Sequence, residues 1–284
     1  MRTRSTQAKP AGFCAFAGAA GHHGPVRIRA AAAVIGISLA LSIPATPIGA
    51  TPATTAPPIP RVGAVFFPYL PGLTQLLGLP HTCTGSVVHS ASRNVVLTAA
   101  HCVLSGSGAG FAFAPGYHDG VFPYGMWTVR RVYVNPAWKA SHDPLHDYAF
   151  LTVAPRTVGG VSRNIEDVVG AYSLGTAPAA GTTVTVDGYL LGAHDRALTC
   201  TTSTYVVAGY PTVDCAGFGD GTSGGPWLRG DQVVGVIGGL HQGGCVDGTS
   251  NTSPFGSDVA ADLARAAAGG PGDFLGLPGS SGCT

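Results

Sequence analysis

The sequence predicts an all-β fold, built as a sandwich or a barrel. Its apolar residues recur in short segments rich in Val, Thr, Tyr and Phe, the residue types that favour strands. Clusters of Gly, Pro, Asn and Asp bound most of these segments, as turns between strands require. A convincing helical pattern occurs in one place only, near the C-terminus. Many short strands separated by turns are typical of sandwiches and barrels.

Eight segments are expected to form strands: residues 61–67, 84–90, 93–100, 128–135, 148–154, 182–191, 202–208 and 232–240. One helix is expected over 258–268, with Ser257 as its N-cap and Gly269 and Gly270 as its stop. A break over 156–173 separates the strands into two sets. We therefore expect an N-terminal unit over 61–160, a C-terminal unit over 161–270, and a tail over 271–284.

The first fifty residues have the pattern of a secretory signal peptide. Five basic residues and no acidic residue precede or flank an apolar run over 30–43, and small residues follow that run up to Ala50. The run is shorter than the ~20 apolar residues that a membrane-spanning helix needs. We expect cleavage after Ala50 and a secreted, extracellular protein.

Residues 51–60, TPATTAPPIP, show no apolar periodicity and are expected to form an extended and mobile spacer. Once the leader is removed, ten Lys and Arg residues face fourteen Asp and Glu residues. The mature chain therefore lacks a basic patch that would attract nucleic acid or anionic lipid. We expect a monomer with neither nucleic acid nor a membrane as a partner.

Six of the seven cysteines lie beyond the leader. An even number of cysteines in a secreted chain indicates disulfide bonds. Six cysteines allow 15 different pairings, so the count alone leaves the connectivity open.

The stretch GDGTSGGPWL, residues 219–228, places Ser223 among four glycines and raises the question of whether it is a nucleophile. A serine needs a base to activate it, and the base needs a third group to orient it. His101 stands at the end of an expected strand in LTAAHC, and Asp147 directly precedes the apolar strand 148–154. The order His, Asp, Ser across the two units favours a catalytic site.

LTAAHC, DYAFLTV and GTSGGPW resemble the three catalytic blocks of the chymotrypsin-like (trypsin-like) serine proteases, and most closely those of secreted actinobacterial trypsin-like peptidases. The resemblance covers residues 62–268. It implies two six-stranded antiparallel β-barrels, with the catalytic site between them, and an enzyme that hydrolyses protein or peptide substrates. The C-terminal helix fits the same pattern.

The resemblance also implies roles for individual residues. Ser223 would be the nucleophile, His101 the general base, and Asp147 the group that orients His101 and stabilises its charged form. The backbone N–H groups of Gly221 and Ser223 would form the oxyanion hole. This chemistry requires neither a cofactor nor a metal.

Other interpretations of these residues carry less weight. Asp143 is a rival for the acid of the triad, but only Asp147 directly precedes the apolar strand. His142, Asp143, His146 and Asp147 superficially resemble a metal cluster, although a Pro-interrupted loop explains them better. The G-x-S-x-G pattern also occurs in α/β-hydrolases, but those require alternating helices and strands and the order Ser, Asp, His. The functional alternative is an inactive protease homologue that binds protein partners.

Two positions depart from the family pattern. Thr222 stands where animal trypsin-like enzymes carry an aspartate that pairs with a freed N-terminus, so we expect no cleavage requirement between Ala50 and Val62 beyond leader removal. Counting back from Ser223 places Gly217 at the floor of the specificity pocket, with Asp214 or Asp220 as alternatives. A small or apolar P1 residue is therefore favoured over Arg or Lys.

His241, in VIGGLHQGG, provides a second indication about specificity. Glutamate-specific bacterial relatives use a histidine at a similar place, so glutamate is the main alternative at P1. The simpler interpretation is that His241 is an exposed loop residue.

The resemblance also suggests disulfide pairings. Cys83–Cys102 fits the family, and Cys200–Cys215 occurs in bacterial relatives. These two pairs leave Cys245 to bond with Cys283. The rival to the last two pairs is Cys215–Cys245.

Overall fold

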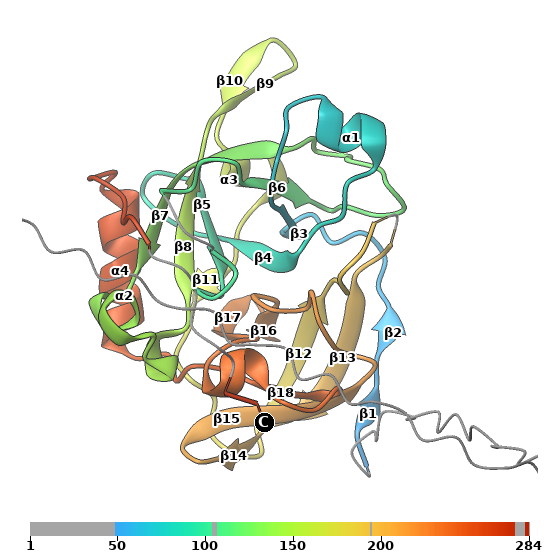
Figure 1. Ribbon diagram of the computed structural model, residues 1–284, viewed down its shortest axis with the longest axis vertical. Helices are drawn as coiled ribbons and strands as arrows, with labels where there is room; N and C mark the ends of the chain where they lie inside the picture. Colours follow the sequence, from blue (N-terminus) through green and yellow to red (C-terminus); the bar gives the residue numbers. More distant parts are fainter. Residues whose placement is uncertain (1–48, 104–106, 194, 276–281, 284) are drawn as a thin grey trace, which may run out of the picture. The chain divides into compact units, whose positions relative to one another are not determined.

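The computed structural model describes residues 49–103, 107–193, 195–275 and 282–283. All but the last two residues of the expected leader lie outside this described part. Figure 1 shows that strands make up most of the fold. No helix in the described part of the chain is long and apolar enough to cross a membrane.

The first half of the chain forms a closed six-stranded barrel with the strand order β3-β4-β5-β8-β7-β6. Each neighbouring pair is antiparallel. Phe113, Trp127 and Leu151 are fully buried in its core. The strands are β3 (Val62–Phe66), β4 (Cys83–Val88), β5 (Val95–Thr98), β6 (Ala112–Pro115), β7 (Trp127–Val134) and β8 (Ala149–Val153).

The second half contains a six-stranded sheet and a four-stranded sheet. The six-stranded sheet has the order β11 (Ser173–Leu174), β17 (Gln232–Val236), β16 (Pro226–Arg229), β12 (Thr183–Gly188), β13 (Leu198–Ser203) and β2 (Thr54–Thr55). In the four-stranded sheet, β15 (Tyr210–Ala216) pairs with β1 (Thr51–Pro52), β14 (Tyr205–Val207) and β18 (Thr249–Asn251). The predicted all-β, two-barrel class is confirmed, and the second barrel is built from these two sheets.

The segment expected to be a mobile spacer is instead part of the second barrel. Thr51 and Pro52 pair in parallel with Cys215 and Ala216, while Thr54 and Thr55 pair with β13. Ala56 is buried, with 4% of its surface exposed. Proline is tolerated here because an edge strand leaves some N–H groups without a required partner. Residues 51–55 therefore link the two sheets, since β1 pairs with β15 of one sheet and β2 with β13 of the other.

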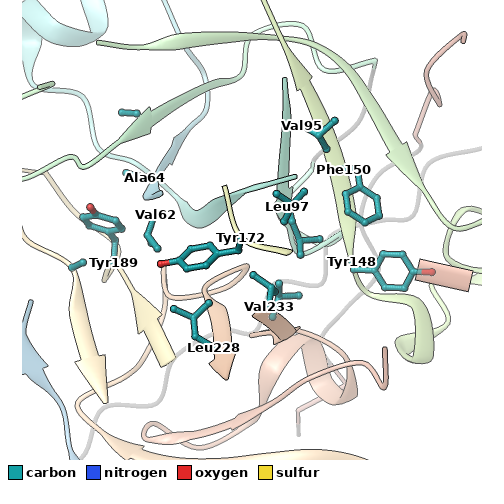
Figure 2. Close-up of a cluster of buried hydrophobic side chains, with 14 of the residues drawn as sticks. Val62, Ala64, Val95, Leu97, Tyr148, Phe150, Tyr172, Tyr189, Leu228 and Val233 are labelled. Atoms are coloured by element: carbon teal, nitrogen blue, oxygen red, sulfur yellow. The ribbon is translucent and has the colours of Figure 1, made fainter. Parts of the chain in front are cut away.

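A shared apolar core joins the two halves. Figure 2 shows Tyr172 between Val62 of the first barrel and Leu228 and Val233 of the second. These four side chains expose at most 9% of their surface. Burial of aromatic and aliphatic area of this extent stabilises the contact between the barrels.

The helices are short except at the C-terminal end. α4 (Ser257–Ala267) packs against β7 and β8 of the first barrel, and its N-cap is Gly256, so the expected cap Ser257 is the first helical residue. The Tyr148 hydroxyl group bonds to Asp258 and Asp262 of this helix, both at 3.0 Å. The other elements are α1 (Leu73–Leu77), α2 (Pro136–Ser141), α3 (Ile165–Val169), the 3-10 turns η1 (Pro144–His146) and η2 (Leu240–Gly243), and the hairpin of β9 (Arg156–Val158) and β10 (Val161–Arg163).

The described residues contain three disulfides: Cys83–Cys102, Cys200–Cys215 and Cys245–Cys283. These are the pairings that the resemblance suggested, and the rival bond Cys215–Cys245 is not formed. The first two are buried, whereas both cysteines of the third are exposed.

Candidate active site

Paired strands bring His101 and Asp147 to the same end of the first barrel. Thr98, at the end of β5, pairs with Ala149, at the start of β8, and the pair is antiparallel. The chain that leaves β5 and the chain that enters β8 therefore meet at one end. His101 Nδ1 lies 2.8 Å from Asp147 Oδ2, and the His101 backbone N–H donates to Asp147 Oδ1 at 2.9 Å.

Asp147 is fully buried and is held by further contacts. The backbone N–H of Gly239 donates to Asp147 Oδ2 at 2.9 Å, so three N–H groups face the carboxylate, including the imidazole N–H. The Asp147 backbone N–H donates to Ser253 Oγ at 3.0 Å, and that hydroxyl group donates to Pro144 O at 2.9 Å. A buried carboxylate that accepts several hydrogen bonds is stable in one orientation.

Asp143, the rival acid, has other partners. Its Oδ2 lies 3.0 Å from His146 Nδ1, and its Oδ1 accepts the Leu145 N–H at 3.0 Å at the start of η1. Of the four residues that superficially resembled a metal cluster, His142 is the C-cap of α2, Asp143 and His146 bond to each other, and Asp147 bonds to His101.

Ser223 lies in the loop between β15 and β16, and contacts from the first barrel hold this loop. The Thr84 backbone N–H donates to Ser223 O at 2.8 Å, and the Thr84 hydroxyl group donates to Gly221 O at 3.1 Å. The same hydroxyl oxygen accepts the Tyr189 N–H at 2.8 Å. Thr84, on β4, is fully buried. It therefore fixes the serine loop against the other barrel.

The glycines beside Ser223 are required by space and by backbone conformation. Gly221 has a φ of +91°, and a Cβ at this position would lie 2.1 Å from Leu191 N. Gly224 has a φ of +78°, and its Cβ would lie 2.1 Å from Thr98 Oγ1. Residues other than glycine rarely adopt this left-handed backbone conformation. These glycines let the loop lie directly on its neighbours.

Thr222 is buried and is bonded within the loop. Its hydroxyl group and its backbone N–H both donate to Gly219 O, at 2.7 and 3.2 Å. A local hydrogen bond thus occupies the position at which the family resemblance would place an aspartate and its ion pair.

Asp187, on β12, lies behind the same loop. A Cβ on Gly225 would lie 2.3 Å from Asp187 O. Among the described residues, the buried Oδ1 of Asp187 has no hydrogen-bond partner. Burial raises the pKa of this carboxyl group to about 6, and a hydrogen bond from Thr199 opposes the increase.

A cleft of about 460 Å³ adjoins these residues. His101, Gly221 and Ser223 line it, as do His241 and Asp247. Gly217 is not among its lining residues, and a Cβ added to Gly217 would lie 3.7 Å from the Ala53 Cβ. The two residues that follow Gly217, Phe218 and Gly219, do line the cleft.

The acidic alternatives for the pocket differ in position. Asp214 Oδ1 accepts hydrogen bonds from Tyr205 and Thr249, at 3.0 and 2.8 Å, outside the cleft lining. Asp220 lines the cleft, and so does Asp247, which the sequence did not indicate.

Comparison with known proteins decides the family. Residues 67–253 match the family described as Trypsin. The chain belongs to the trypsin family of serine endopeptidases. Over 114 residues it is 32% identical to the glutamyl endopeptidase of Bacillus licheniformis, an alignment that covers 38% of this chain and 32% of that relative. The chain thus spans about a third of the length of the curated relative it matches.

Solved structures of the trypsin fold cover most of the chain. The protease Anisep from Arthrobacter nicotinovorans is 26% identical, with a TM-score of 0.61, and covers 76% of this chain and 99% of its own. The thermostable serine protease AL20 from an extremophilic microorganism is 24% identical, with a TM-score of 0.58, and covers 74% of this chain and 98% of its own. The latter likeness concerns the fold alone.

Proposed function

We propose that this protein is a secreted serine endopeptidase that hydrolyses peptide bonds through an acyl-enzyme. The observation that carries the proposal is the pair of hydrogen bonds between His101 and Asp147, beside a cleft that Ser223 also lines. Membership of the trypsin family supports it. Three disulfides and the signal-like N-terminus support secretion, since disulfides persist in oxidising compartments.

In the proposed mechanism, Asp147 holds the proton of His101 on Nδ1 and leaves Nε2 as the base. Ser223 Oγ attacks the carbonyl carbon of the scissile peptide bond while Nε2 takes the hydroxyl proton. The same proton passes to the leaving amine as the C–N bond breaks. Water then attacks the acyl-enzyme with His101 again acting as base, which releases the acid and restores Ser223.

The backbone N–H groups of Gly221 and Ser223 are proposed to bind the oxyanion of the tetrahedral intermediate. The left-handed Gly221 and the two bonds from Thr84 keep this segment in one conformation before substrate arrives. Donors that are already oriented need no rearrangement in the transition state. The reaction requires no cofactor.

For the P1 side chain we propose glutamate. The sequence alone favoured a small or apolar residue, on the assumption that Gly217 formed the pocket floor. His241 lines the cleft and Gly217 does not, and a relative is named a glutamyl endopeptidase. An imidazole can donate a charge-assisted hydrogen bond to a substrate carboxylate.

The catalytic proposal can be tested with a fluorophosphonate probe that labels active serine hydrolases. The folded wild-type protein should react, whereas Ser223→Ala and His101→Ala should lose labelling. Ser162→Ala, on the exposed hairpin strand β10, is the matched control and should label like the wild type. A folded wild type that does not react, or a Ser223→Ala variant that still does, would favour a groove that only binds protein partners.

The P1 proposal can be tested with peptides that differ only at P1, carrying Glu, Gln, Ala, Leu or Lys. kcat/KM should be highest for Glu, and His241→Ala should reduce the preference for Glu over Gln at least tenfold. Equal values for Glu and Gln in the wild type would exclude recognition of the carboxylate.

A further inference from the structure

The last described residues of the chain lie at the substrate cleft. Cys283 is one of its lining residues, together with its disulfide partner Cys245. The bond joins residues 38 positions apart. It therefore holds the C-terminal segment beside the residues proposed to contact the P1 side chain.

Gly282 lies beside the imidazole of His241. A Cβ added to Gly282 would lie 3.4 Å from His241 Nδ1 and 3.9 Å from Cε1. The ligand-type atoms of His241, Cys245 and Cys283 lie within 4.8 Å of one another. Because the two sulfur atoms are bonded to each other, this cluster is a packing contact between the tail and His241.

The loop that carries His241 has an unfavourable backbone. His241 and Gln242 have φ values of 53° and 56°, and Gly243 and Gly244 are also left-handed. Non-glycine residues in this region cost energy and persist only where surrounding contacts hold them. The holding contacts include the Gln242 N–H to Gly239 O at 2.9 Å and Asn251 Nδ2 to Leu240 O at 3.3 Å. The disulfide anchors the end of the same loop, at Cys245.

The opposite end of the tail is fixed to the first barrel. The Asp273 N–H donates to Val132 O at 2.8 Å, and Asp273 Oδ2 accepts the Val134 N–H at 3.0 Å. Leu275 is buried in the core of that barrel. The C-terminal segment thus has one anchor on each barrel, and the disulfide is the one at the cleft.

We propose that the Cys245–Cys283 disulfide makes Cys283 part of the wall of the P1 pocket and positions His241 for the P1 side chain. The inference rests on the proposed peptidase function and extends it to the determinants of specificity. Within the described residues of the tail, 271–275 and 282–283, none is hydrogen-bonded to His101, Asp147 or Ser223, so cleavage chemistry should continue when the disulfide is broken. Selectivity among P1 residues should decrease.

Differences in burial allow this bond to be opened selectively. Cys245 and Cys283 are exposed, whereas Cys83, Cys102, Cys200 and Cys215 are buried. Access controls the rate of thiol–disulfide exchange. One molecule of dithiothreitol, which carries two thiol groups, reduces the bond to two cysteine thiols and is itself oxidised to a cyclic disulfide.

The experiment treats the folded protein with increasing dithiothreitol, alkylates free thiols, and identifies the modified cysteines by mass spectrometry. The same samples are assayed with the P1 peptide series and the fluorophosphonate probe. As Cys245 and Cys283 become alkylated, the ratio of kcat/KM for the best P1 residue to that for P1 Ala should fall at least tenfold, mainly through KM. Probe labelling should stay within twofold.

The double variant Cys245→Ser/Cys283→Ser is the matched control. It should show the reduced selectivity without dithiothreitol and no further change with it. An unchanged P1 profile in fully alkylated, probe-reactive protein would overturn the inference while leaving the proposed function intact. Wild-type protein that neither reacts with the probe nor cleaves any peptide would instead overturn the proposed function, and with it this inference.

Discussion

Thr84 of the first barrel donates its backbone N–H to the carbonyl oxygen of Ser223 in the second barrel, at 2.8 Å. Its hydroxyl group adds a bond to Gly221 O and accepts the Tyr189 N–H. One buried side chain therefore fixes the serine loop and the strand behind it. The relative position of Ser223 and His101 depends on this contact, because the two residues belong to different barrels.

Replacing Thr84 with Val should reduce kcat about tenfold and lower the unfolding free energy by about 1–3 kcal/mol. Val keeps the shape and the backbone bond, but it leaves Tyr189 N buried without an acceptor. Thr84→Ser keeps the hydroxyl group and should stay within threefold of the wild type in kcat. Peptide hydrolysis and urea unfolding measure both effects. Equal kcat for the Val and Ser variants would mean that the hydroxyl group does not position the loop.

Replacing Asp147 with Asn should lower kcat by about 10³–10⁴ while the protein remains folded. An amide that donates toward His101 Nδ1 would stabilise the tautomer with its proton on Nε2, which cannot accept the proton of Ser223. Asp143→Asn is the matched control, and its kcat should stay within threefold of the wild type, because Asp143 bonds to His146. If the two variants lost similar activity, the assignment of Asp147 as the orienting acid would be wrong.

Deleting residues 51–61 should destabilise the protein by about 2–4 kcal/mol. The deletion removes β1, β2, the buried Ala56, and the bonds from Ala53 N to Ala216 O and from Ala56 N to Ala197 O, each at 2.8 Å. A short uncleavable tag placed before Thr51 keeps these contacts and should leave kcat/KM within threefold. A hundredfold loss with the tag alone would show that a free N-terminus is required, against the expectation from Thr222.

Asp187 should make stability depend on pH in the acidic range. Its folded pKa is raised, so the folded state binds more protons than the unfolded state between pH 3.8 and about 6. The contribution is fully present below pH 3.8 and is lost as the pH rises through about 6. This change in pKa corresponds to roughly 3 kcal/mol of unfolding free energy.

The measurement is urea unfolding at pH 4 and pH 8 in a Ser223→Ala background, which prevents self-digestion. Relative to its parent, Asp187→Asn should gain roughly 2–2.5 kcal/mol of unfolding free energy between the two pH values, because Asn cannot ionise. Asp231 is exposed, so the unfolding free energy of Asp231→Asn should differ from that of the parent by less than about 0.5 kcal/mol at both pH values. Parallel pH profiles for Asp187→Asn and its parent would contradict the raised pKa.

The sequence was informative wherever a local pattern determined the structure. The apolar strands that became β3, β5 and β8 were recognisable, and the pairing of β5 with β8 places His101 beside Asp147. The edges of the sheets were harder to predict. β16 begins at Pro226 and ends at Arg229, and β1 and β2 arise from a Pro/Thr-rich segment whose strand character comes only from its partners.

Contacts between distant parts of the chain had no local signal. Thr84 appears in the sequence as one more threonine in a strand, since its partners Ser223 and Tyr189 lie more than a hundred residues away. The position of Gly217 outside the cleft depends on the path of the loop before Ser223, which residue counting does not determine. Asp187 likewise appears as one polar residue within the expected strand 182–191, and only packing shows that it is buried.

The pairing of residues 51–55 with the second barrel has a consequence for the order of folding. Thr51 Oγ1 donates to Thr202 Oγ1, 151 residues further along the chain, and β1 pairs with β15 beyond that. During synthesis β1 therefore remains without its partner strand until β15 has been made. Contacts between such distant segments form late and slowly. The first barrel, whose strands all lie between Val62 and Val153, can close before the segment that precedes it finds its place.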